Sequence, residues 1–159
     1  EPLLHTLDAK ASRCAIEEIR AKKSASTPIM ISGTITDASG RTLSGQTVEA
    51  FRISLSHIPV LSIGFNCALG ADQLLPYVKR LSKQSDHFIS AHPNAGLPNA
   101  FGEYDQTPEQ MRDLIEDYLK QDVVNIIGGC CGTTPEHIRL IAELAKKYSP
   151  RNPKALLND

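Results

Sequence analysis

The stretch Val123-Val124-Asn125-Ile126-Ile127-Gly128-Gly129-Cys130-Cys131-Gly132-Thr133-Thr134-Pro135 joins an apolar run, a glycine-rich loop with two adjacent cysteines, and a helix start. The run 123–127 predicts a strand buried on both faces, because it is nearly continuous rather than alternating. Thr134 and Pro135 predict an N-cap followed by a proline at the first helical position. This strand–loop–helix unit therefore carries its cysteines at the carboxyl end of a strand.

The same kind of unit repeats along the chain. Apolar runs predict strands at residues 29–35, 60–65, 87–91 and 123–127. Amphipathic segments predict helices at residues 46–57, 71–84, 108–120 and 135–148, with another at about 8–22. Strand starts about 30 residues apart match the length of a strand–helix unit. This order predicts an α/β fold, and it leaves two architectures open: a doubly wound sheet, or part of a closed eight-stranded barrel.

Composition narrows the class of protein. The chain has 159 residues, of which 41% are hydrophobic, and a formal net charge of -1. Such a charge gives no field that would recruit nucleic acid or an anionic membrane. The apolar runs are far shorter than the roughly 20 residues of a membrane helix, and the start of the chain lacks a signal pattern. We therefore expect a cytoplasmic protein whose partners include neither nucleic acid nor membrane.

Both ends of the sequence indicate how the chain is divided into domains. The chain begins Glu1-Pro2-Leu3 without an initiator methionine, so we expect a fragment of a longer protein. Residues 149–159 contain Pro150 and Pro153 among polar residues, which is typical of a linker. The sequence thus predicts one domain over residues 1–148 and a linker toward a next module over residues 149–159.

Three of the four cysteines lie where catalytic groups are expected. Cys67 follows the second predicted strand, and Cys130 and Cys131 follow the fourth. Both places are carboxyl ends of parallel strands, where α/β enzymes hold their reacting groups. Three thiolates suit Zn²⁺, which takes sulfur ligands in a tetrahedron, and they leave one position for a substrate. Cys14 lies within a predicted helix, and we interpret it as a core residue.

Other interpretations of the adjacent cysteines remain open at this point. Cys130 and Cys131 could form a vicinal disulfide, or could simply be two small buried residues. Residues 128–133 could also be a glycine-rich loop that cradles phosphate at a helix start. The loop lacks both GxGxxG and GxxxxGK[ST], which weakens the phosphate interpretation.

Two motifs together resemble a known family. Gly64-Phe65-Asn66-Cys67-Ala68-Leu69-Gly70, with Gly128-Gly129-Cys130-Cys131-Gly132-Thr133-Thr134-Pro135, is similar to the zinc signature of the homocysteine S-methyltransferase family. Ser32-Gly33-Thr34 through Gly40-Arg41-Thr42-Leu43-Ser44-Gly45-Gln46, and His92-Pro93-Asn94-Ala95-Gly96-Leu97-Pro98-Asn99, resemble the homocysteine-binding module of cobalamin-dependent methionine synthases more than stand-alone transferases. The resemblance runs from Glu1 to about Arg151. It implies a (β/α)8 TIM-type barrel of which this chain supplies about strands 5–8 and the helices following them.

The resemblance also implies an activity. Members transfer a methyl group to homocysteine, giving methionine, with Zn²⁺ activating the substrate sulfur. In methionine synthases the methyl donor is methylcobalamin, bound by another module and recharged from methyltetrahydrofolate, and the partners are the cobalamin and folate modules of the same polypeptide. The alternatives are a stand-alone transferase using S-methylmethionine or S-adenosylmethionine, or an inactive fragment that binds zinc or thiols.

Residue roles follow from the same resemblance. It implies Cys67, Cys130 and Cys131 as the zinc ligands, with no catalytic residue beyond the zinc site. Asn94 matches a residue that can take the fourth zinc position without substrate, although a turn-capping role is equally open. Glu1 and Asn66 are expected at the substrate. We expect His92 to support a metal ligand or to pack, rather than to bind the metal itself. We treat Glu103, Tyr104 and Asp105 as solvated loop residues.

Overall fold

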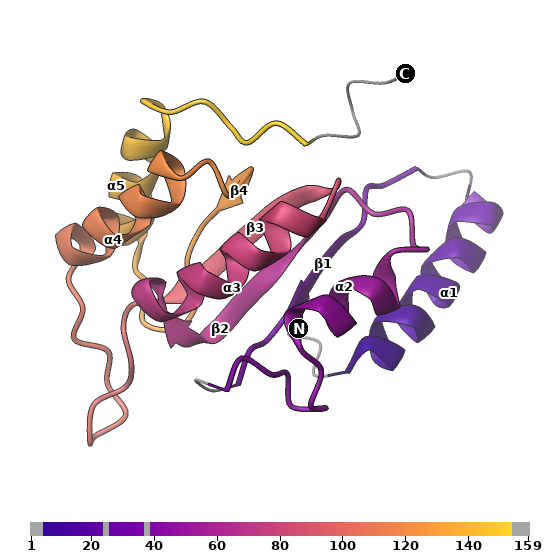
Figure 1. The fold of residues 1–159 in the computed structure, drawn as a ribbon, viewed down its shortest axis with the longest axis horizontal. Helices are drawn as coiled ribbons and strands as arrows, with labels where there is room; N and C mark the ends of the chain where they lie inside the picture. Colours follow the sequence, from indigo (N-terminus) through magenta and orange to yellow (C-terminus); the bar gives the residue numbers. More distant parts are fainter. Residues whose placement is uncertain (1–4, 24–25, 37–38, 154–159) are drawn as a thin grey trace.

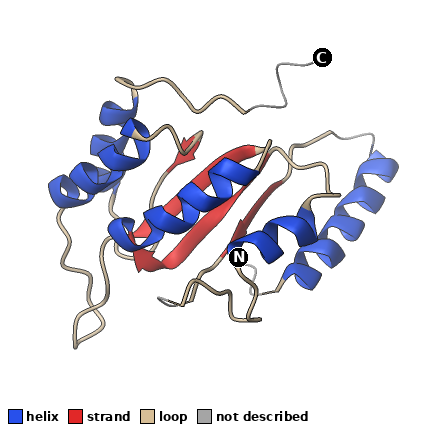
Figure 2. Ribbon diagram, in the orientation of Figure 1, coloured by secondary structure: helices blue, strands red, loops and turns tan. Residues whose placement is uncertain are grey.

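The structure, a computed structural model, describes residues 5–23, 26–36 and 39–153 (Figure 1). Five helices and four strands alternate along these residues (Figure 2). In chain order they are α1 Thr6–Lys23, β1 Met30–Gly33, α2 Val48–Leu55, β2 Ser62–Gly70, α3 Ala71–Gln84, β3 Phe88–Asn94, α4 Pro108–Lys120, β4 Ile126–Ile127 and α5 Pro135–Ala145. None of the described helices combines the length and apolar character needed to cross a bilayer.

The sheet order distinguishes between the two predicted architectures. All neighbouring strands are parallel, and their order is β1-β2-β3-β4, the order of the chain. A doubly wound sheet reverses its direction of growth at a switch point, whereas this sheet never reverses. Each connection leads to the next strand on the same side of the sheet. Because such crossovers are right-handed, they place all the connecting helices on one face of the sheet. The arrangement is therefore that of a segment of barrel wall.

The hydrophobic core lies between the sheet and this helical layer. Strand residues Ile63, Phe65 and Ile89 are buried and point toward the helices. In Figure 1, α3 crosses in front of β2 and β3, and it buries residues with helical spacing such as Leu74 and Val78. The rings of Phe51 in α2 and Phe65 in β2 have centroids 5.3 Å apart. This packing fixes the strands on which the candidate site is built.

The opposite face of the sheet is lined by small and polar side chains. Strand residues alternate between faces, so the neighbours of the core residues point away from the helices. They are Ser32, Gly64, Asn66, Ser90 and His92. Ser32 Oγ donates to Asn66 Oδ1 at 2.6 Å, which links β1 to β2 on this face. A face of this character suits a polar ligand better than an apolar core.

Several predicted boundaries differ from the observed elements. The second strand reaches Gly70, beyond the predicted end at residue 65, so Cys67 lies within β2 rather than after it. The fourth strand covers only Ile126–Ile127 of the predicted residues 123–127, and among the described residues it pairs with β3 alone. Helices α3 and α4 begin and end as predicted.

The interpretation of Cys14 as a core residue is wrong. Cys14 is exposed, and the buried residues of α1 are Thr6 and Ala9. The face of α1 turned toward Ile31 includes Ala9 and Ile16. Cys14 lies five positions from Ala9, which at 3.6 residues per turn turns its side chain well away from that face.

The segment after α5 is fastened to the sheet by a buried arginine. Arg151 is 6% exposed. Its guanidinium donates to the carbonyls of His87 at 3.0 Å and Ser82 at 2.8 Å, and also to that of Ser85. Its own carbonyl accepts from Asn125 Nδ2. Arg151 thus joins residues 149–153 to the end of α3 and the starts of β3 and β4, while the boundary predicted at residue 148 stays a prediction.

Replacing this arginine tests its structural role. Arg151→Ala leaves buried carbonyls without donors, so we expect a loss of roughly 2–4 kcal/mol in the free energy of unfolding, measured by urea denaturation. Arg112→Ala is the control, because Arg112 pairs with the exposed Asp113, and its loss should change stability by less than about 0.5 kcal/mol. Equal effects of the two substitutions would contradict this role.

Candidate metal centre

Strand β2 is irregular where it carries Cys67. The pairs Asn66–His92 and Gly70–Asn94 enclose more residues on β2 than on β3, so β2 bulges between them. Cys67 and Ala68 have φ angles of 63° and 59°, in the left-handed region. That conformation is uncommon for residues other than glycine and costs of order 1–3 kcal/mol. Such an outlier at a strand end points to a functional constraint.

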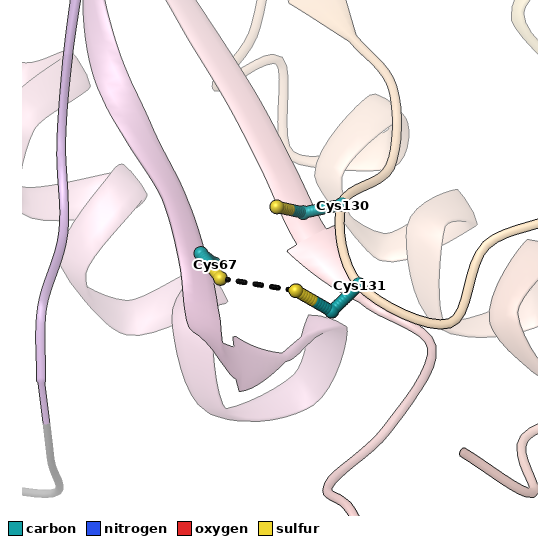
Figure 3. A group of neighbouring side chains, drawn as sticks. All are labelled: Cys67, Cys130 and Cys131. Atoms are coloured by element: carbon teal, nitrogen blue, oxygen red, sulfur yellow. Dashed lines mark hydrogen bonds between the residues drawn. The ribbon is translucent and has the colours of Figure 1, made fainter. Parts of the chain in front are cut away.

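The bulge determines the direction of the Cys67 side chain. In a regular strand Cys67 would share a face with Phe65, because side chains alternate, and would point into the core under α2. A bulge re-aims the side chains that follow it. Here it turns the Cys67 sulfur toward the loop that follows β4 (Figure 3).

The other two cysteines lie in residues 128–133, which we call the cysteine loop. This loop continues the parallel pairing of β4 beyond Ile127. Cys130 N donates to the Pro93 carbonyl at 2.8 Å, and Ala95 N donates to the Cys131 carbonyl at 2.9 Å. Cys131 N donates to Asn94 Oδ1 at 3.1 Å. The end of β3 therefore holds both cysteines in place.

The three sulfurs converge across β3. Cys67 Sγ and Cys131 Sγ are 3.4 Å apart, and the sulfurs of Cys67, Cys130 and Cys131 all lie within 4.8 Å of one another (Figure 3). Sulfur ligands at roughly 2.3 Å in a tetrahedron around Zn²⁺ would be about 3.8 Å apart. Within the described part of the chain, no other group of histidine, cysteine or acidic residues is so placed. The cluster has the donor set and the spacing to hold a metal ion.

The structure also bears on the other interpretations of these cysteines. All of them are free thiols, and Cys131 is exposed while Cys67 and Cys130 are half-buried, so this is not a vicinal disulfide or a buried pair. A phosphate loop needs free backbone N–H groups. The N–H groups of Cys130 and Cys131 are already bonded to Pro93 and Asn94. The geometry favours a metal over a phosphate.

The other predicted site residues differ in how they relate to the cluster. Asn94 is 2% exposed, and its amide oxygen accepts a hydrogen bond from Cys131 N. Asn94 therefore has a structural role in addition to the ligand role that was predicted for it. Asn66 accepts from Ser32 next to Cys67. His92 is outside the group of possible ligands, and burial lowers the pKa of its ring. Glu1 lies outside the described residues. These ligand and substrate roles stay predictions.

Two residues near the cluster have surroundings that the sequence analysis did not predict. Tyr104, interpreted there as a solvated loop residue, is half-buried, and its side chain lies against Gly132 of the cysteine loop. Burial raises the pKa of Tyr104, and so do the charge of Cys131 and hydrogen bonding to it. His137 is buried, with Nε2 3.0 Å from the Gln106 carbonyl and Nδ1 accepting from Thr134 N at 3.1 Å. The sequence did contain a signal for His137. It is the third helical residue after the N-cap Thr134, which is the position where a capping box has Glu or Gln.

Comparison with known proteins adds two findings. Residues 2–145 match the model of a protein family described as homocysteine S-methyltransferase. The apo homocysteine methyltransferase MmuM from Escherichia coli has a similar structure, with 21% identity and a TM-score of 0.60, and the match covers 82% of this chain and 44% of that chain. Its metallated form gives 21% identity and a TM-score of 0.60 over 81% of this chain and 39% of that one. The chain thus spans less than half the length of these structures, and their likeness confirms the predicted partial barrel.

A glycine in the cysteine loop provides a test of how Tyr104 packs against that loop. Gly132 has φ +77°, and a Cβ there would lie 2.3 Å from Tyr104 Cβ, so in Gly132→Ala a steric clash adds to backbone strain. We expect it to lose roughly 2–4 kcal/mol of unfolding free energy in urea denaturation.

The matched control is Gly45→Ala. Gly45 has φ +82°, and a Cβ there would meet nothing within 4 Å, so only strain of about 1 kcal/mol applies. If both alanine variants lose the same stability, Tyr104 does not pack against the loop as described.

Proposed function

This chain belongs to the homocysteine S-methyltransferase family, and we propose that it serves zinc-dependent transfer of a methyl group to the sulfur of homocysteine, giving methionine. The observation that carries the proposal is the convergence of three cysteine sulfurs within 4.8 Å of one another. They lie at the carboxyl ends of parallel strands, where barrel enzymes hold their reacting groups. A similar structure, that of a homocysteine methyltransferase, has a metallated form, which supports a metal at this cluster.

Each cysteine has a defined part in the proposed centre. Cys67 approaches from β2, and Cys130 and Cys131 approach from the cysteine loop on the far side of β3. Three protein ligands leave one tetrahedral position for the substrate sulfur. Zn²⁺ held there would keep the homocysteine thiol, whose ordinary pKa is roughly 8.5, deprotonated at neutral pH. The exposure of Cys131 leaves that position accessible from solvent.

Neighbouring side chains are proposed to position the substrate. Asn66 sits one residue before Cys67, on the polar face of the sheet, and its oxygen is fixed by Ser32. This leaves its amide nitrogen as the natural donor toward a bound amino acid. Asn94 is proposed to approach the fourth position when substrate is absent. The role assigned to Glu1 rests on the resemblance alone.

The proposed methyl donor is methylcobalamin. The support is the resemblance of the segments at residues 32–46 and 92–99 to the homocysteine-binding module of cobalamin-dependent methionine synthases. On this proposal the partners are homocysteine and the cobalamin and folate modules of one cytoplasmic polypeptide. The rival donors are S-methylmethionine and S-adenosylmethionine.

Cysteine substitutions test the metal centre. We expect one zinc per chain in the wild-type protein and essentially none in Cys67→Ser, Cys130→Ser or Cys131→Ser, measured by elemental analysis. Transfer to homocysteine should be lost in parallel, because the substrate thiol would no longer be deprotonated. Cys14→Ser is the matched control, since Cys14 is exposed on α1 and should leave the zinc content unchanged. A wild-type chain with free reactive thiols and no zinc would favour the inactive fragment.

The methyl donor can be tested separately. The intact polypeptide is assayed for methionine formation with homocysteine and either methylcobalamin, S-methylmethionine or S-adenosylmethionine. Activity with methylcobalamin alone is the expected result. Activity with S-methylmethionine or S-adenosylmethionine alone would preserve the metal centre and reject the cobalamin proposal.

A further inference from the structure

We propose that His137 is a positioning residue of the metal centre, whose neutral imidazole joins the N-termini of α4 and α5 and so holds the cysteine loop in place. The inference rests on the proposed function, because its effect is measured on a metal bound by the three cysteines. It concerns a residue on a helix, outside the elements that carry the ligands.

The hydrogen bonds of His137 define the state of its ring. Thr134 N lies 3.1 Å from Nδ1, and because a backbone N–H can only donate, Nδ1 accepts. The hydroxyl oxygen of Thr134 lies 2.8 Å from the same nitrogen. A ring whose Nδ1 accepts carries its hydrogen on Nε2, which lies 3.0 Å from the Gln106 carbonyl. The imidazole is therefore neutral, and it accepts on one side while it donates on the other.

The preceding helix shows what a histidine adds at this position. Helix α4 begins with a capping box in which Gln110 Oε1 accepts from Thr107 N at 2.9 Å. In α5 the corresponding residues are Thr134 and His137. A glutamine satisfies this cap, so capping alone does not require a histidine. The imidazole adds a second nitrogen on its far side, and this nitrogen donates to Gln106.

The bond to Gln106 joins two segments next to the cysteine cluster. Gln106 directly precedes the N-cap of α4, and α5 directly follows the cysteine loop. The two helices lie side by side (Figure 1). His137 is 4% exposed, so water cannot readily replace the Gln106 carbonyl, and loss of the bond would leave a buried N–H without a partner. The imidazole therefore fixes the start of α5 to the end of the connection that follows β3.

This connection, residues 95–106, contacts the cysteine loop near both of its ends. Ala95 N donates to the Cys131 carbonyl at 2.9 Å. Tyr104 lies against Gly132, because a Cβ on Gly132 would be only 2.3 Å from Tyr104 Cβ. The cysteine loop is thus held along the connection and, through the imidazole, at the helix into which it leads.

A fixed cysteine loop favours metal binding. A loop that moves freely loses conformational entropy when a metal orders it, and this loss weakens binding. Groups that support metal ligands typically change metal affinity by roughly 10–100-fold. The hydrogen bonds that His137 makes in the described part of the chain go to Thr134 and Gln106, so it acts on the cysteines through the backbone. We therefore expect an effect at the lower end of this range.

The substitution His137→Asn separates the two functions of the imidazole. The oxygen of asparagine lies as many bonds from Cα as Nδ1 does, so it can still accept from Thr134 N, but the side chain ends before the position of Nε2. We expect the dissociation constant of the intact polypeptide for Zn²⁺, from chelator competition, to rise about 10-fold. In the Co²⁺-substituted protein the ligand-field absorption bands, which report the geometry of the ligands, should also change.

The matched control is His87→Asn, the same chemical change in a half-buried histidine. Nδ1 of His87 lies 3.4 Å from Ser85 Oγ, just before β3 begins and at the end of the sheet opposite the cysteines. Its metal affinity and absorption bands should equal those of the wild-type protein. Unchanged affinity and bands in His137→Asn, or equal changes in the two variants, overturn the role of His137 and leave the proposed function intact.

A measurement on the wild-type protein keeps the proposal testable if the variant does not fold. Two-bond proton–nitrogen correlation NMR distinguishes which ring nitrogen of His137 carries the hydrogen. We expect it on Nε2 alone at neutral pH, with slow exchange against water because the ring is buried. A hydrogen on Nδ1 overturns the role of His137. Failure of the wild-type chain to bind one metal ion overturns the proposed function instead, whatever the state of the ring.

Discussion

The hydrogen bonds between the end of β3 and the cysteine loop are the constraint on which the candidate site depends. Cys130 N bonds to the Pro93 carbonyl, and Asn94 receives the Cys131 N–H. Strand β4 is only two residues long, so these bonds provide much of the order in the loop. Without them two adjacent cysteines on a glycine-rich segment would have many orientations, and their sulfurs would not converge with that of Cys67.

The site therefore combines a regular and an irregular strand end. On one side of β3 the pairing continues smoothly past Ile127, and on the other side β2 departs from it at Asn66. The left-handed backbone at Cys67 and Ala68 is the unfavourable part of this arrangement. The packing of Phe65 against Phe51 holds the strand while the bulge re-aims the next residues. Strain at the site is thus compensated by the core beneath it.

The sequence was sufficient for the regular parts of this structure. Amphipathic periodicity placed α3 and α4 correctly, because it is a local signal. The positions of the cysteines at strand ends followed from the same periodicity. The bulge at Cys67 did not follow, since neither Cys nor Ala signals a left-handed backbone. Tyr104 was wrongly interpreted as a solvated loop residue, because its approach to Gly132 depends on tertiary structure. The exposure of Cys14 depends on which face of α1 is covered.

The position of β3 between the two ligand-bearing elements has a consequence for assembly. Cys67 and Cys131 are 64 positions apart, and they meet only when β2, β3 and β4 are aligned side by side. Contacts of such long range form late, because the intervening loop must be closed first. During synthesis Cys67 emerges as a solitary thiol well before its partners exist. Metal binding should accordingly be one of the last folding events. A chain with metal bound at the three cysteines would then be one whose sheet has formed correctly.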